Sequence, residues 1–109
     1  MTNIYETTII VKPDLANDQL KNLNSSIDQF FSENNVPIGY KEDWGIKNLK
    51  SAINKYSKGS FKFMRFNSSS DFPKKLDSFL KFNTDCLRFL ITKTSNELDE
   101  VTPQINKEN

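Results

Sequence analysis

The order in which the hydrophobic period changes along this sequence restricts its fold more than any single motif. Runs typical of β-strands, rich in β-branched and aromatic residues, occur at residues 4–11, 36–50, 61–68 and 86–93. Helical spacings of three and four separate the first run from the second, and the third from the fourth. The expected order of elements is therefore strand–helix–strand, repeated once.

Two amphipathic helices are expected in these intervals. In the first, Asn17 is the expected N-cap and the pair Asn34-Asn35 supplies a left-handed stop. In the second, Pro73 fits the first turn. The side chains expected to face the core are Leu20, Leu23, Ile27, Phe30 and Phe31 in the first helix, and Leu76, Phe79 and Leu80 in the second.

Glycine and proline positions modify the second strand. Pro37 and Gly39 near its start indicate an edge strand, and Gly45 directly after Trp44 indicates a bulge. Residues 51–60, SAINKYSKGS, are expected to form a loop before the third strand.

This order of elements predicts an α+β fold, the ferredoxin-like split β-α-β sandwich. The sheet would be antiparallel, with strands in the spatial order 4-1-3-2 and both helices on one face. We expect one domain over residues 1–94 and a polar, acidic, mobile tail over residues 95–109. The first, third and fourth strands carry large apolar side chains on both parities, so the face without helices is expected to contact a partner.

Composition excludes several kinds of chemistry. The chain has no histidine and a single cysteine, Cys86, which leaves no Ser-His-Asp or Cys-His arrangement, no imidazole metal site and no internal disulfide. No apolar run is long enough to span a membrane, and the N-terminal residues lack the basic region of a signal peptide.

The net charge of +1 conceals a basic middle of the chain. Residues 1–43 hold three lysines and seven acidic residues, whereas residues 44–93 hold eleven Lys and Arg and three acidic residues. Residues 94–109 hold one lysine and four acidic residues. Charge alone fits two interpretations equally, an anionic partner such as RNA or a solvated lysine-rich face.

Three segments resemble the bacterial small-subunit ribosomal protein S6 family in order and spacing: YETTIIVKPDL, EDWGIKNLKSAINK and FLKFNTDCLRFLITK. The resemblance extends from about residue 3 to residue 94. The family pattern in the middle segment is matched by Gly45, Lys47, Asn48, Leu49, Ile53 and Lys55. It is not matched at Lys50, nor at Ser51 and Ala52, where the family has tyrosine and proline.

The resemblance implies a protein without catalytic activity, cofactor, metal or small-molecule substrate. It also implies that the protein pairs with ribosomal protein S18. As that pair, it would bind the central domain of small-subunit rRNA. The implied location is the ribosome, in a bacterial cytoplasm or in an organelle with a bacterial-type ribosome.

Ten residues are candidates for contact with RNA or with the protein partner. Trp44 fits packing beside a bulge better than a partner contact. The lysines would by default be solvated, and the resemblance favours their contact with RNA or with the partner. Tyr5 and Phe63 could stack on bases, although core or protein interface is the safer interpretation. The full set is Tyr5, Trp44, Lys47, Asn48, Lys50, Lys55, Lys58, Phe63, Arg65 and Arg88.

Two other functions are compatible with the same fold. An independent single-strand RNA-binding module of the RNA-recognition type would bind without a partner and would depend on Tyr5 or Phe63. A small enzyme, such as an acyl phosphatase, would need clustered catalytic groups. Asp14 and Asp18 occur at a helix start, and Glu42 and Asp43 at a strand end, with no partner base.

Overall fold

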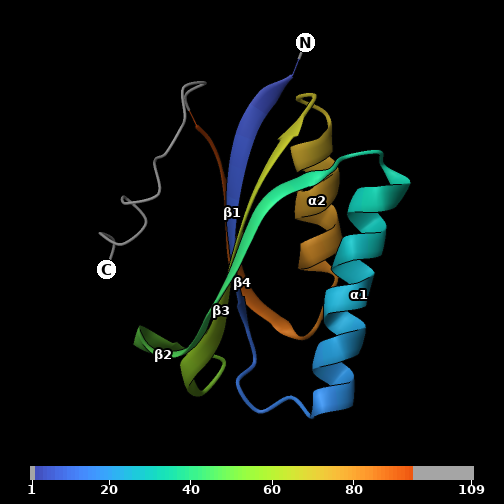
Figure 1. Ribbon diagram of the computed structural model, residues 1–109. Coiled ribbons are helices and arrows are strands. Elements are labelled where there is room, and N and C mark those ends of the chain that lie inside the picture. Colours follow the sequence, from blue (N-terminus) through green and yellow to red (C-terminus); the bar gives the residue numbers. More distant parts are fainter. Residues whose placement is uncertain (1, 95–109) are drawn as a thin grey trace.

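The computed structural model describes residues 2–94, which form a four-stranded antiparallel sheet with two helices on one face (Figure 1). The strands lie in the order β2-β3-β1-β4, as the element order predicts. The ferredoxin-like prediction is therefore confirmed, while the predicted tail at 95–109 lies outside the described residues. In chain order the elements are β1 Asn3–Val11, α1 Asn17–Glu33, β2 Ile38–Ile53, β3 Tyr56–Ser68, α2 Phe72–Lys81 and β4 Cys86–Lys93.

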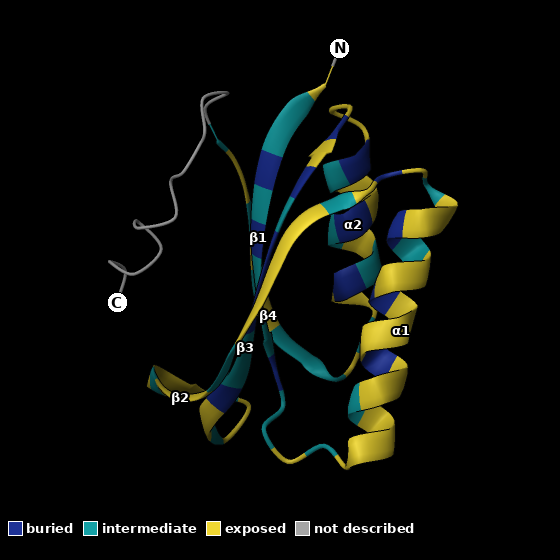
Figure 2. Cartoon of the chain, in the orientation of Figure 1, coloured by how far each residue is buried: buried dark blue, intermediate teal, exposed yellow. Residues whose placement is uncertain are grey.

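The hydrophobic core fills the layer between the helices and the sheet (Figure 2). Rings from three elements meet there, with Phe31 of α1 5.1 Å from Phe66 of β3 and 5.0 Å from Phe72 of α2. Phe30 stacks on Phe79 at 4.3 Å and so joins the two helices. Aromatic pairs at these distances add to the stability gained from buried area.

The ends of α1 agree only in part with the sequence. Asn17 is the first helical residue and Ala16 is the N-cap, so the prediction of Asn17 as the cap is wrong. The physical reason is Gln19, whose Oε1 accepts a hydrogen bond from the Ala16 N–H at 2.9 Å, as in half of a capping box. The left-handed stop is confirmed, because Asn35 has φ 58° and Asn34 donates to the Phe30 carbonyl.

The expected loop at residues 51–60 is also wrong, because β2 and β3 continue through it as a long hairpin. Only Asn54 and Lys55 separate the strands, and both have positive φ, 49° and 73°. Two left-handed central residues are the pattern of a type I′ turn, which matches the twist of a hairpin. The usual glycine at the second position is replaced here by lysine, so the turn has no clear sequence signal.

The end of this hairpin extends beyond the sheet. Strand β1 pairs with β3 only as far as Val11 opposite Ser60, so residues 47–59 form a two-stranded segment, which we call the hairpin arm. Its base is tightly packed, since a Cβ on Gly59 would lie 2.4 Å from Ile10 Cγ2. Near its tip, the Tyr56 hydroxyl donates to the Asp14 carboxylate at 3.4 Å.

Replacing Gly59 with alanine is therefore expected to lower the free energy of unfolding by about 1–3 kcal/mol, since the branched Ile10 side chain cannot move aside without disturbing β1. Urea unfolding followed by circular dichroism measures the effect. Gly39→Ala is the matched control, because its nearest atom is 3.5 Å away, and we expect a change within about 0.5 kcal/mol. Equal effects of the two substitutions would contradict the packing described for the base of the arm.

Candidate protein and nucleic-acid interface

The face of the sheet opposite the helices is uncovered in the part of the chain that the structure describes (Figure 1). Side chains from all four strands line a shallow hollow of about 390 Å³ on this open face. Its lining is mostly apolar, and Leu90 is 62% exposed beside it. The lining residues are Glu6, Thr8, Ile10, Trp44, Phe61, Phe63, Arg88, Phe89, Leu90 and Thr92.

Trp44 forms one wall of the hollow because β2 has a bulge at this point. The register with β3 shifts between Asp43 and Gly45, and Gly45 has φ 79°, which favours glycine. The Gly45 N–H donates to Asp43 Oδ1 at 2.9 Å and closes the bulge. The Trp44 ring then stacks on Phe63, with centroids 5.4 Å apart and planes at 8°. The bulge predicted from the Trp44-Gly45 pair is confirmed.

A carboxylate holds the Trp44 ring in place. Glu42 accepts hydrogen bonds from Trp44 Nε1, at 2.7 Å, and from the Tyr40 hydroxyl. These hydrogen bonds, that from Trp44 first, lower the pKa of the Glu42 carboxyl group from its ordinary value. The same contact with Glu42 raises the pKa of Tyr40, and the Gly45 N–H lowers the pKa of Asp43.

Arg65 has an internal partner on this face. Its Nη2 and Nε donate to Glu6 Oε2 at 2.8 and 3.1 Å, and its guanidinium lies 5.7 Å from the Tyr40 ring and 5.8 Å from the Phe63 ring. Arg88 has a different environment, because it is exposed, borders the hollow and lies opposite Ile10 of β1. The candidate Arg88 is therefore more available to a partner than Arg65.

The two aromatic residues considered for base stacking are not accessible. Tyr5 points into the core, where it is 7% exposed and stacks on Phe66 at 5.8 Å. Tyr5 thus has the core position that was the safer of its two interpretations, and a base could reach the ring only by displacing the core. Phe63 does face the open side, but Trp44 covers it and leaves it 2% exposed.

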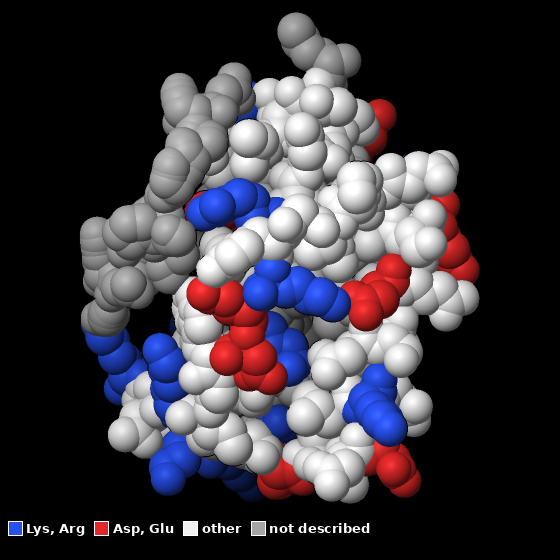
Figure 3. All heavy atoms as spheres, viewed as in Figure 1, with Lys and Arg blue, Asp and Glu red and all other residues white. Residues whose placement is uncertain are grey.

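The remaining candidates gather on the hairpin arm. Lys and Arg side chains cluster at the lower left of Figure 3, where Figure 1 places the end of the β2–β3 hairpin. Lys47 is tied to the sheet, because its Nζ lies 5.2 Å from the Trp44 ring and 5.9 Å from the Phe61 ring. The exposed arm candidates are Lys47, Asn48, Lys50, Lys55 and Lys58.

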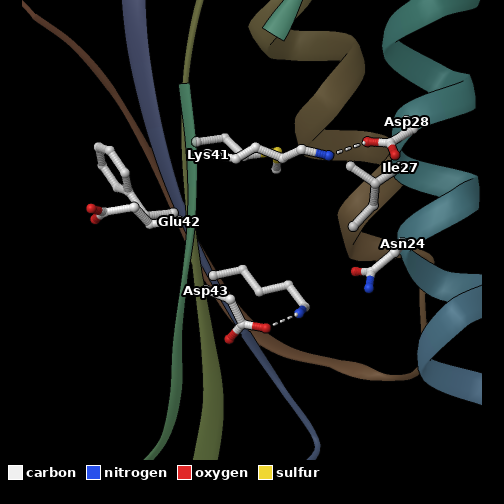
Figure 4. Close-up of a pocket in the computed structure, with 9 residues that line it drawn as sticks. Asn24, Ile27, Asp28, Lys41, Glu42 and Asp43 are labelled. Atoms are coloured by element: carbon white, nitrogen blue, oxygen red, sulfur yellow. Dashed lines mark hydrogen bonds and ion pairs between the residues drawn. The ribbon is translucent and has the colours of Figure 1, made fainter. Parts of the chain in front are cut away.

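A second hollow of about 220 Å³, for which the sequence patterns gave no indication, lies between α1 and strands β2 and β3 (Figure 4). Lys41 points to Asp28 across it, at 3.0 Å, and the nine-tenths buried side chain of Lys62 pairs with Asp43 at 3.3 Å. A carboxylate therefore accompanies each ammonium group, and the hollow has no free cation for an anionic ligand. The sequence signal was Lys62 itself, a charge on the same strand parity as the buried Met64.

Neither a metal centre nor a membrane-spanning helix occurs within residues 2–94. Among these residues no three His, Cys, Asp or Glu side chains lie together as ligands for a metal ion. Neither of the helices described is both long and apolar enough to cross a membrane. What the described face offers is an apolar hollow next to a basic arm, an arrangement suited to binding.

Comparison with known proteins gives a consistent result. The model of the family Ribosomal protein S6 matches residues 4–93. The chain is 32% identical over 97 residues to the small ribosomal subunit protein bS6 of Geobacter metallireducens, covering 89% of this chain and 82% of that one. It is 31% identical over 87 residues to that of Aquifex aeolicus, covering 79% of each chain. The crystal structure of 30S ribosomal protein S6 from Thermotoga maritima has the same fold, with a TM-score of 0.79, 19% identity, and coverage of 86% of this chain and 89% of that chain.

The contact between Glu42 and Trp44 predicts a pH dependence. Because the folded-state pKa of Glu42 is lowered, the contact stabilises the fold above the unfolded pKa and is lost as the pH falls through the folded pKa. Trp44 is the only tryptophan, so its fluorescence should titrate with a midpoint below 4.5, the ordinary value for a glutamate, while circular dichroism reports a folded chain.

Glu42→Gln is the control for this titration, since it keeps one acceptor oxygen but removes the ionisable group. The acidic fluorescence transition should disappear in this variant. A midpoint at or above 4.5, or a transition unchanged in Glu42→Gln, would show that Glu42 does not hold the indole ring.

Proposed function

The chain belongs to the ribosomal protein S6 family, and we propose that it binds the central domain of small-subunit rRNA as a heterodimer with ribosomal protein S18. Members of this family are structural, non-enzymatic components of the bacterial-type small ribosomal subunit. The observation that carries the proposal is the family match over residues 4–93, which includes every described strand and helix except the first residue of β1. In this proposal residues 1–94 are the ribosomal domain and residues 95–109 a separate acidic tail.

The open face supports a protein partner. The hollow has an apolar floor that includes Ile10 and Phe61, and the exposed Leu90 stands beside it. An apolar area of this kind, bordered by charge, is typical of a surface that associates with another protein. Arg88 at the border can pair with a carboxylate of S18, whereas Arg65 is already paired with Glu6.

Pairing also explains how a nearly neutral protein can bind RNA. Exposed lysines give modest affinity that depends on salt, because each phosphate contact releases counterions. A heterodimer presents the basic surfaces of two proteins at once and fixes their relative positions before RNA binds. The chain alone is then expected to bind rRNA weakly.

The alternative, an independent module of the RNA-recognition type, has less support. Such modules stack bases on exposed aromatic rings of the open sheet face. Here Tyr5 belongs to the core and Phe63 lies beneath Trp44. An exposed apolar side chain such as Leu90 fits a protein contact better than a nucleotide contact.

A gel-shift titration of a central-domain rRNA fragment tests the proposal directly. With S18 from the same organism present, we expect binding at least about tenfold tighter than with either protein alone, because the two basic surfaces act together. Equal affinity for the chain alone and for the mixture would contradict the heterodimer mechanism and favour the independent module. A matched fragment from another rRNA domain controls for non-specific binding.

Leu90→Gln tests the position of the protein partner. Removing an exposed apolar side chain beside the hollow should weaken the S18 heterodimer at least about tenfold in isothermal titration calorimetry, without loss of folding. Phe82→Gln is the matched control, because Phe82 is 85% exposed but lies at the C-terminal end of α2. If Phe82→Gln weakened the heterodimer and Leu90→Gln did not, the partner would bind elsewhere.

A further inference from the structure

Most residues of the hairpin arm are exposed. The strand β3 pairs with β1 only as far as Ser60 and beyond it pairs only with β2, and Figure 1 shows this end of the hairpin away from both helices. An isolated two-stranded ribbon is marginally stable in water. Here the base is fixed by Gly59 against Ile10, and the tip by Tyr56 on Asp14. The arm is therefore held at a defined position relative to the sheet.

The charges of the arm lie on both of its faces. Gly59 and Phe61 are two residues apart on β3 and so lie on the same, open side of the sheet. Lys47 pairs with Gly59, and its side chain therefore approaches the Phe61 ring. Side chains alternate along a strand, so Lys58, next to Gly59, points to the opposite face. Lys55 is at the turn between them. The arm thus presents ammonium groups on two sides and at its tip.

These charges have no internal compensation. No acidic residue occurs between Asp43 and Asp71, and the arm residues have a formal charge of +4. The ion pairs within residues 2–94 involve other side chains, namely Lys41, Lys62, Arg65 and Lys81 with Asp28, Asp43, Glu6 and Asp77. The four arm lysines therefore have no ion-pair partner within residues 2–94, and they are concentrated on one short hairpin.

We propose that the hairpin arm is an RNA-binding element that inserts between two segments of phosphate backbone, while the open-face hollow contacts only the protein partner. This inference rests on the proposed function and divides its surface into two parts. RNA is the occupant that fits the arm, because phosphates of two backbone segments can face both sides and the tip together. Lysine is also a point charge that tolerates varied phosphate geometry, whereas the hollow is apolar and suits a side chain.

Two matched triple variants test this assignment. The first is Lys50→Gln/Lys55→Gln/Lys58→Gln in the arm, which leaves Lys47 on its aromatic rings. The second is Lys21→Gln/Lys74→Gln/Lys75→Gln on the exposed surfaces of α1 and α2, with the same change in net charge. Each variant is combined with S18, and binding to the central-domain rRNA fragment is measured at several salt concentrations. Calorimetry without RNA measures the heterodimer affinity.

Log affinity falls with log salt, and the arm variant should reduce the magnitude of this negative slope by about two to three. It should also weaken RNA binding at least about tenfold. Its heterodimer affinity for S18 should be unchanged. The helix variant should keep both the slope and the affinity of the unmodified chain. These results together would assign phosphate contacts to the arm.

Three outcomes would overturn the inference, and they can be distinguished. If both variants weakened RNA binding equally, the effect would come from net charge and not from the arm. If the arm variant weakened pairing with S18 instead, the arm would be a protein contact. If the unmodified pair failed to bind the fragment, the proposed function itself would fail, and the arm assignment with it.

Discussion

The bulge at Trp44 and Gly45 is the local feature on which both candidate surfaces depend. It adds one residue to β2 opposite β3, and a shift of one residue moves every following side chain to the other face of a strand. As a result Lys47 lies over Trp44 and Phe61 on the open side, and Leu49 packs near Gly59 at the base of the arm. Without the extra residue, these two side chains would point toward the helix side.

Charge is distributed so that the sheet is largely neutralised and the arm is not. Glu6 pairs with Arg65 on the open face, while Asp43 and Asp28 pair with Lys62 and Lys41 on the helix side. Each of these pairs is partly exposed or at the border of the core, so its net contribution to stability is small. Their consequence is electrostatic instead: they neutralise Lys41, Lys62 and Arg65 near the sheet, whereas no lysine of residues 47–59 has an ion-pair partner within the described chain.

The sequence predicted the fold well, because the order of elements and the helical periodicity depend on many residues at once. The sequence did not predict the turn between β2 and β3, where the conformation of a single residue decides the local structure. Lys55 in a left-handed conformation concealed the hairpin turn, since the common signal at that position is glycine.

The candidate site was predictable only in part, for a related reason. Tyr5 could not be assigned to a face from β1 alone, because that strand is apolar on both parities, and only its register opposite Phe66 places it in the core. The arm lysines were visible as a basic segment. The arm extends beyond the sheet because β1 stops pairing with β3 at Val11, opposite Ser60. The end of this pairing is a tertiary property, which the local sequence does not reveal.

Hydroxyl-radical footprinting of side chains, with the chain alone, with S18, and with S18 and rRNA, would test the account most directly. If the open face binds S18, Leu90 and Trp44 should lose reactivity when S18 is added, while Phe82 stays reactive throughout. If the arm binds RNA, Tyr56 should lose reactivity only when rRNA is added as well. Protection of Phe82 by S18, with Leu90 still reactive, would contradict the central claim that the open sheet face is the protein interface.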